Sequence, residues 1–204
     1  MATFISLHIK TENRNHVLKL LQELSCADQL ITGPYPKELN DNILLGEYAN
    51  PTFLAISDVQ NGWITVQINS FQKLYDWAEI ISKELNTSFI QIIGQTVSDV
   101  YYFLLYENGV LRREIEIYHG ELDNITDKGE KFPFEKPSLV PINEGDYKDI
   151  FDRDTLEFYC KEFGFDLFEY PEPDLYFILK KKNLGTTIKK YVLANQPKPW
   201  WKFW

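Results

Sequence analysis

The chain has 204 residues, of which 44% are hydrophobic and 15% aromatic, and its formal net charge is −9. A chain of this length and composition buries enough apolar surface to fold without disulfides, which excludes global disorder. The acidic balance argues against a general nucleic-acid binder, because attraction to phosphates supplies most non-specific affinity. No apolar run approaches the roughly 18 residues that a membrane helix requires, and the N-terminus lacks a signal-peptide pattern. We therefore expect a cytoplasmic globular protein.

The first elements expected along the chain are a strand and a helix. Apolar residues alternate with polar ones over residues 5–10, which predicts a strand that carries His8 on its polar face. Four apolar residues at helical spacing predict a helix over residues 15–24. Prolines and a glycine then interrupt residues 25–46, so we expect this stretch to be mostly connection.

Two Asn-Gly pairs, at residues 61–62 and 108–109, predict β-hairpins, because these residues suit the two positive φ angles of a type I′ turn. Regular alternation around the first turn predicts one apolar face, formed by Phe53, Ala55, Ser57, Val59, Ile64, Val66 and Ile68. Around the second turn it predicts another, formed by Val100, Tyr102, Leu104, Leu111, Ile115 and Ile117. Asp99, Arg112, Glu114 and Glu116 are then expected on the opposite face.

A helix and a buried strand are expected between the two hairpins. Ser70 is a competent N-cap for an amphipathic helix over residues 71–85, and residues 89–93 form an apolar run that ends at Gly94. The order strand, helix, two strands, helix, strand is typical of a ferredoxin-like sheet. We therefore predict an α+β fold: a ferredoxin-like antiparallel sheet with helices on one face, extended by the second β-hairpin and followed by a smaller C-terminal α/β portion.

The expected domain organisation has four segments: a ferredoxin-like domain over 1–119, a proline- and glycine-rich connection over 120–150, a small helix-strand portion over 151–195, and an aromatic tail over 196–204. Apolar spacing in the third segment predicts a helix over 154–163 and a strand over 175–179. The pattern over 186–193 fits a strand or a helix equally well.

Five polar residues form the main candidate for chemistry: Asp99, Tyr101, Arg112, Glu114 and Glu116. Carboxylates two positions apart on a strand lie roughly 7 Å from each other, a separation that suits acid–base catalysis or a metal. A solvated ladder of ion pairs on an open sheet face is the alternative, and the absence of a converging histidine or second acidic cluster favours it. Arg113 is expected on the apolar face, where it either reaches the sheet edge or pairs with a buried acid.

Patterns for metals and cofactors are missing from the sequence. Residues 121–130 are acidic, but Ile125 stands where a calcium loop needs an oxygen ligand, so we expect a solvated loop. The three histidines, together with Cys26 and Cys160, lack zinc-site spacing, and reduced, packed thiols are favoured over a disulfide. No glycine-rich phosphate-binding loop occurs. We therefore expect no metal and no cofactor.

The C-terminal tail is the most distinctive segment for binding. Trp200, Trp201, Phe203 and Trp204 follow two prolines, and residues 175–204 hold seven lysines and no acid. Such a tail suits docking on its own chain, docking in a partner groove, or contact with a membrane interface without stable insertion. We expect its three tryptophans to pack on protein, of this chain or of a neighbour, because solvated indoles leave apolar surface in water.

Three groups of residues resemble a loose group of uncharacterised small bacterial proteins, some of them similar to immunity proteins of toxin systems. The first group is Trp77, Ala78, Ile81, Ser82 and Leu85; the second is Tyr102, Asn108, Gly109, Val110, Leu111 and Arg113; the third is Gly129, Lys131, Phe132, Pro133, Phe134 and Glu135. Residues 156–167, which end in Gly-Phe-Asp-Leu, fit the same group. The resemblance implies a noncatalytic protein and supplies no catalytic residues.

The function expected from the sequence is that of a noncatalytic cytoplasmic module that binds another protein, with an immunity-type protein as its more specific form. An acidic surface suits a basic partner. The alternative is a hydrolase or metal-dependent enzyme that uses the carboxylates of the second hairpin, and it requires a well-formed pocket around them. The oligomeric state and the identity of the partner are left open.

Overall fold

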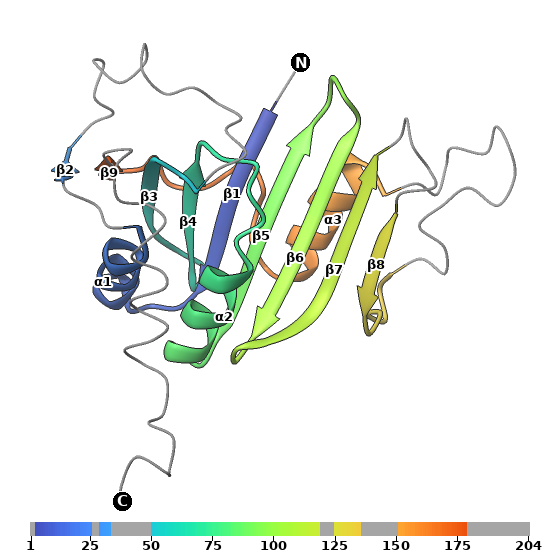
Figure 1. Ribbon diagram of the computed structural model, residues 1–204, viewed down its shortest axis with the longest axis horizontal. Coiled ribbons are helices and arrows are strands. Elements are labelled where there is room, and N and C mark those ends of the chain that lie inside the picture. The colour runs from blue at the N-terminus through green and yellow to red at the C-terminus, as the bar shows by residue number, and fades with distance from the viewer. Residues whose placement is uncertain (1–2, 26–28, 34–49, 119–124, 136–150, 179–204) are drawn as a thin grey trace, which may run out of the picture.

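The computed structural model describes residues 3–25, 29–33, 50–118, 125–135 and 151–178. Within these ranges the fold is α+β: nine strands form one open antiparallel sheet, and three helices pack on it (Figure 1). The strands are β1 (Thr3–Lys10), β2 (Gln29–Thr32), β3 (Phe53–Gln60), β4 (Trp63–Ile68), β5 (Ser88–Gln95), β6 (Val100–Glu107), β7 (Val110–Tyr118), β8 (Thr126–Gly129) and β9 (Leu175–Ile178). The helices are α1 (Arg14–Ser25), α2 (Tyr75–Glu84) and α3 (Arg153–Glu162). None of the described helices is long and apolar enough to cross a membrane.

The strand order is β2-β9-β3-β4-β1-β5-β6-β7-β8, so strands far apart in the chain lie side by side. The expected C-terminal helix and strand are present. Strand β9 joins the sheet between β2 and β3, and helix α3 packs on β6. The segment over 25–46 was expected to be mostly connection; among its described residues, Gln29–Thr32 form β2, because β9 supplies the hydrogen-bonding partner.

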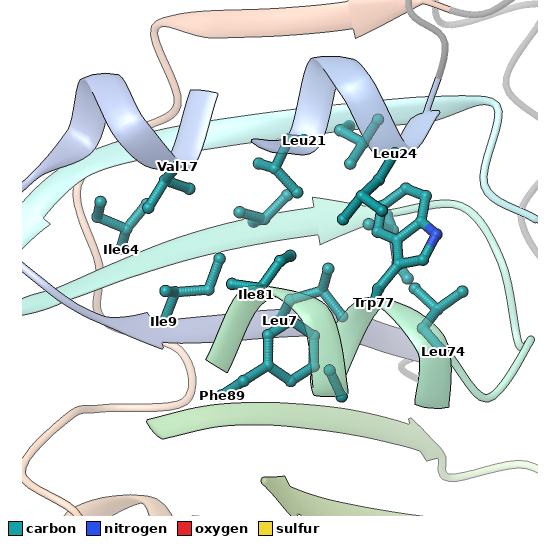
Figure 2. Close-up of a cluster of buried hydrophobic side chains, with 14 of the residues drawn as sticks. Leu7, Ile9, Val17, Leu21, Leu24, Ile64, Leu74, Trp77, Ile81 and Phe89 are labelled. Carbon is teal, nitrogen blue, oxygen red and sulfur yellow. The ribbon is translucent and has the colours of Figure 1, made fainter. Parts of the chain in front are cut away.

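Two hydrophobic cores lie on opposite faces of the sheet. On one face, α1 and α2 cover the centre of the sheet, as expected (Figure 1). Figure 2 shows this core, with side chains from both helices, β1, β4 and β5 pointing toward one another: Leu7, Ile9, Val17, Leu21, Leu24, Ile64, Leu74, Trp77, Ile81 and Phe89. On the other face, α3 and the chain that follows it cover β5, β6 and β7. The strands are therefore buried on both faces where they cross the middle of the molecule.

Each Asn-Gly pair joins two antiparallel strands, but each predicted apolar face is correct only on one side of a register shift and wrong beyond it. Asn61 and Gly62 connect β3 to β4 with φ angles of 53° and 79°, and Asn108 and Gly109 connect β6 to β7 with 53° and 81°. A register shift lies near each turn, between Ile56 and Val59 in β3 and beside Leu105 in the β6–β7 pair. Such a bulge adds one residue to a strand and moves every side chain beyond it to the other face.

The register shift in β3 divides its apolar residues between two faces. Leu54 and Ile56 pair with Ile68 and Val66 in the helix-covered core, whereas Phe53 and Ala55 pack with Tyr176 on the other side. The Ser57 hydroxyl accepts a hydrogen bond from the Thr65 N–H at 3.0 Å. This side-chain bond satisfies an amide that the bulge takes out of the regular ladder.

Three local expectations are also corrected. Helix α2 begins at Tyr75 and not at residue 71, because the Ser70 hydroxyl bonds to the nearby Gln72 N–H and leaves the cap position to Leu74. Strand β5 continues through Gly94, whose missing side chain leaves room for the ring of Phe4. His8 is fully buried and not on a polar face, because the chain after α3 covers it.

Candidate functional site

A pocket of about 390 Å³ opens on the helix-covered face of the sheet, over the ends of β5, β6 and β7. The segment that leads into α2 forms its other wall. Four aromatic rings and two aliphatic side chains line it together with four polar residues: Phe71, Gln72, Lys73, Tyr75, Ile93, Gln95, Val100, Tyr102, Glu116 and Tyr118. The volume is at the lower end of the range for small-ligand pockets, which is about 300 to 1,000 Å³. It suits one or two aromatic side chains.

A buried glutamine holds the wall formed by residues 71–74 in place. Gln91 points from β5 into the helix-covered face and is completely buried. Its Oε1 accepts a hydrogen bond from the Leu74 N–H at 2.9 Å, and its Nε2 donates to the Gln72 carbonyl at 2.8 Å. Since this segment makes no strand ladder, the glutamine supplies the pairing that a neighbouring strand otherwise would. Lys73 and Tyr75 are thereby held above the sheet.

Lys73 and Lys128 neutralise the two carboxylates of β7. Lys73 Nζ lies 2.5 Å from Glu116 Oε2 and 3.9 Å from Glu114 Oε1, and Lys128 Nζ lies 3.0 Å from Glu114 Oε2. The Lys73 ammonium also lies 5.0 Å from the centre of the Tyr102 ring, within the range of a cation–π contact. The two charged pairs therefore give this part of the face no net charge.

Tyrosine hydroxyls complete the network around the carboxylates. Tyr75 donates to Glu114 Oε1 at 2.5 Å, and Tyr118 donates to Glu116 Oε1 at 3.0 Å. Burial, followed by the hydrogen bond to Glu114, raises the pKa of Tyr75 well above its usual value. Tyr75 therefore stays protonated and acts as a donor. All four carboxylate oxygens have a donor, so the pair is satisfied by the protein itself.

Tyr102 contributes its ring, and not an accessible hydroxyl, to the pocket. The residue is 1% exposed, and its hydroxyl lies beside that of Tyr75 in the interior. Burial, with Tyr75 and Glu114 nearby, raises the pKa of this hydroxyl far above the physiological range, so it stays protonated.

The structure brings together only two of the five polar residues predicted for this hairpin. Glu114 and Glu116 lie side by side on the helix-covered face, opposite Leu104 and Tyr102. They are buried, with Glu114 1% exposed, so the expected solvated ladder is wrong. Tyr101 points into the core under α3, Arg112 pairs with Glu107 at 3.1 Å near the turn, and Asp99 occupies the β5–β6 turn with a φ of 47°. The shift beside Leu105 is the cause, because it turns Glu114 and Glu116 toward α2.

Arg113 meets a buried acid, which is one of the two predicted outcomes. Its side chain is 0% exposed and binds Glu135, also 0% exposed, through Nε at 2.8 Å and Nη2 at 2.6 Å. Asp127 pairs with Nη1 at 2.5 Å. This ion pair holds residues 132–135 against the face of the sheet that α3 covers, away from the pocket. Its role is structural.

The other candidate residues form no site in the described part of the chain. Asp127, from the acidic segment, pairs with Arg113 and Lys131, and no group of three or more metal-binding side chains gathers within the ranges described. Cys160 is a buried free thiol, and burial raises its pKa. Cys26 and the tail residues Trp200, Trp201, Phe203 and Trp204 lie outside the described residues.

Sequence reasoning missed Gln91, Lys73 and Tyr75, which shape the pocket. No spacing rule connects Lys73 with Glu116, 43 residues later, because the contact depends on how the segment before α2 crosses the sheet. The alternation along β6 did place Tyr102 and Leu104 on one face. It does not place Glu114 and Glu116 on that face as well, unless the bulge in the β6–β7 pair is known.

The arrangement offers aromatic walls beside a neutralised ion-pair network. It suits the binding of an apolar, planar group that carries a hydrogen-bonding atom. Comparisons with protein-family models, with curated proteins and with solved structures find no match.

Proposed function

We propose that this chain is a noncatalytic cytoplasmic module that binds a protein partner, and that the pocket receives an aromatic side chain flanked by basic residues. The observation that carries the proposal is the pocket of about 390 Å³, whose walls include Phe71, Tyr102 and Tyr118. Aromatic anchors in pockets of this kind dominate the energetics of many interfaces. Tryptophan and tyrosine suit such a pocket, because each combines a large apolar ring with a polar atom.

The rim of the pocket supports a protein partner. Tyr118 is 38% exposed and Val97, in the turn between β5 and β6, is 61% exposed. The turn leads directly into Val100, which lines the pocket, so exposed apolar surface continues from the pocket opening onto the turn at the ends of β5 and β6. Apolar surface around a concave site is typical of a protein-binding surface.

The charge of the chain supports a basic partner. Residues 179–204 contribute seven lysines and no acid, so residues 1–178 carry −16. Such a charge accelerates the approach of a basic protein and disfavours acidic ones. A noncatalytic role fits the carboxylates, because each of their oxygens already accepts a hydrogen bond from a lysine or tyrosine side chain. A general base needs access to a substrate proton.

Two finer assignments belong to the same proposal. The strand order β3-β4-β1-β5, with α1 and α2 packed on one face, supports a ferredoxin-like unit extended by β6, β7 and β8. The resemblance to immunity-type proteins supports a toxin as the partner, encoded by a neighbouring gene. Co-purification of the chain with the product of an adjacent gene tests this more specific form.

A display library of random peptides, selected on the purified full-length chain, tests the proposal. We expect the enriched peptides to carry an aromatic residue next to lysine or arginine. Each binder is then measured on Val100→Phe, which fills the pocket, and on Val110→Phe, a matched change of a 57% exposed valine at the other end of the β6–β7 pair. Binding is expected to be lost on the first variant and retained on the second. Binders that tolerate Val100→Phe contradict the proposal.

A further inference from the structure

We infer that the C-terminal tail of this chain, residues 196–204, docks in the pocket over β5, β6 and β7 and competes there with the partner. This inference rests on the proposed function in one respect, the use of the same pocket. The tail lies outside the described residues, so the argument uses its sequence together with the geometry of the pocket.

The chemistry of the tail matches the chemistry of the pocket. Residues 196–204 contain three tryptophans and one phenylalanine, with Lys198 before them and Lys202 between them. An indole ring fits walls formed by Phe71, Tyr102 and Tyr118, and its N–H is a donor with no acceptor of its own. The side chain of Gln95, which lines the same pocket, carries an amide oxygen that can accept such a bond.

Charge favours docking on the same chain. The seven lysines of residues 179–204 face a body that carries −16, so the tail and the body attract each other at any orientation. Lys73 and Lys128 neutralise only Glu114 and Glu116 within the pocket region, and most of the acidic charge of the body lies elsewhere. Long-range attraction therefore brings the tail to the body, and the apolar walls select where the indoles bind.

The tail is long enough to reach the pocket. The strand registers place Ile178, the last residue of β9, at the same end of the sheet as Ile93 in the pocket wall. Five strand spacings separate β9 from β6, which is about 24 Å at 4.8 Å per spacing. The 21 residues from 179 to 199 span up to about 70 Å when extended. A tethered segment of this length is present at an effective concentration on the order of 1 mM.

The test uses two full-length proteins and two peptides. The proteins are the wild type and the variant W200A/W201A/W204A, which keeps the chain length and every lysine. The probe is a fluorescently labelled peptide of residues 196–204, and its control carries alanine at the same three tryptophans. Fluorescence anisotropy measures the affinity of each peptide for each protein.

We expect the probe to bind the variant at least about tenfold more tightly than the wild type, because the tethered tail of the wild type occupies the pocket. The alanine peptide, with the same charge, is expected to bind neither protein. Adding Val100→Phe to the variant is expected to abolish binding of the probe, whereas Val110→Phe is expected to leave it unchanged. Hydrogen exchange adds a second measurement: the ends of β5, β6 and β7 exchange faster in the variant than in the wild type, while α1 is unchanged.

Equal affinity of the probe for both proteins overturns the inference, as does binding that survives Val100→Phe or that the alanine peptide reproduces. The proposed function fails separately. If peptides from the display library lose binding on Val100→Phe but the tail probe does not bind, only the inference falls. If neither depends on Val100, both fall.

Discussion

Gln91 of β5 accepts a hydrogen bond from the Leu74 N–H at 2.9 Å and thereby sets where helix α2 begins. Leu74 occupies the N-cap position without a side-chain cap of its own, and Gln91 accepts from its N–H, which is the role of a glutamate or glutamine at N3 in a capping box. The same glutamine donates to the Gln72 carbonyl. One buried side chain therefore positions both the helix and the wall of the pocket.

Replacing Gln91 with leucine is expected to destabilise the protein by about 1 to 3 kcal/mol, because the buried Leu74 N–H loses its acceptor. Gln22→Leu, on the exposed side of α1, is the matched control and is expected to stay within about 0.5 kcal/mol of the wild type. Urea unfolding at neutral pH measures both. A loss at Gln91 no larger than that at Gln22 shows that the glutamine does not hold the segment.

The two glutamates of the second hairpin allow a comparison of buried and exposed charge. Glu114→Gln removes the charge that holds Tyr75, Lys73 and Lys128, and is expected to cost about 1 to 3 kcal/mol. Glu107→Gln removes the partner of the half-exposed Arg112 and is expected to cost under about 1 kcal/mol. Equal costs in chemical unfolding rule out a buried network around Glu114.

Arg113 and Arg112 are neighbours in β7 with opposite surroundings. Arg113→Met leaves Glu135 buried without its cation and is expected to cost about 3 to 5 kcal/mol, whereas Arg112→Met is expected to cost under about 1 kcal/mol. The double variant R113M/E135M is expected to recover more than half of the loss, since it removes both charges. Thermal and urea unfolding of the three variants test this. A double variant no more stable than Arg113→Met contradicts the buried pair.

His8 is expected to make the stability of the protein fall in acid. Burial lowers the pKa of His8 to about 3, from about 6.5 in an unfolded chain. Between these values the unfolded state holds more protons than the folded state, so the free energy of unfolding decreases as the pH falls. The loss amounts to roughly 1.4 kcal/mol per pH unit, about 4 to 5 kcal/mol by pH 3.

The measurement is urea unfolding at pH 7, 6, 5 and 4 for the wild type and for His8→Gln. The variant loses the hydrogen bonds to Ser6 and Thr65 and starts from a lower stability, but its profile is expected to be flatter below pH 6.5. Parallel profiles for the two proteins exclude His8 as the group responsible.

The secondary structure elements were largely predictable from the sequence, because they depend on local patterns. Helical spacing predicted α1 within a residue at each end, and the Asn-Gly pairs predicted the turns after β3 and β6 from positive φ angles that those residues tolerate. The antiparallel α+β class follows from such elements and their order. Arg113 was expected either to reach the sheet edge or to pair with a buried acid, and the structure shows the second outcome, with an acid 22 residues away.

Most of the candidate site was decided by tertiary structure. A bulge adds one residue where packing and a nearby side chain favour it, and no local pattern marked the shifts beside Ile56 and Leu105. Because side chains alternate along a strand, each shift moved a whole face, which turned Glu114 and Glu116 toward Lys73 and Tyr75. The alternation along β1 predicted His8 on a polar face, yet α3 and the chain after it bury that face of the strand. The sequence by itself determined the elements and their turns, whereas contacts between distant segments decided which side chains meet, because those contacts depend on register and layer packing.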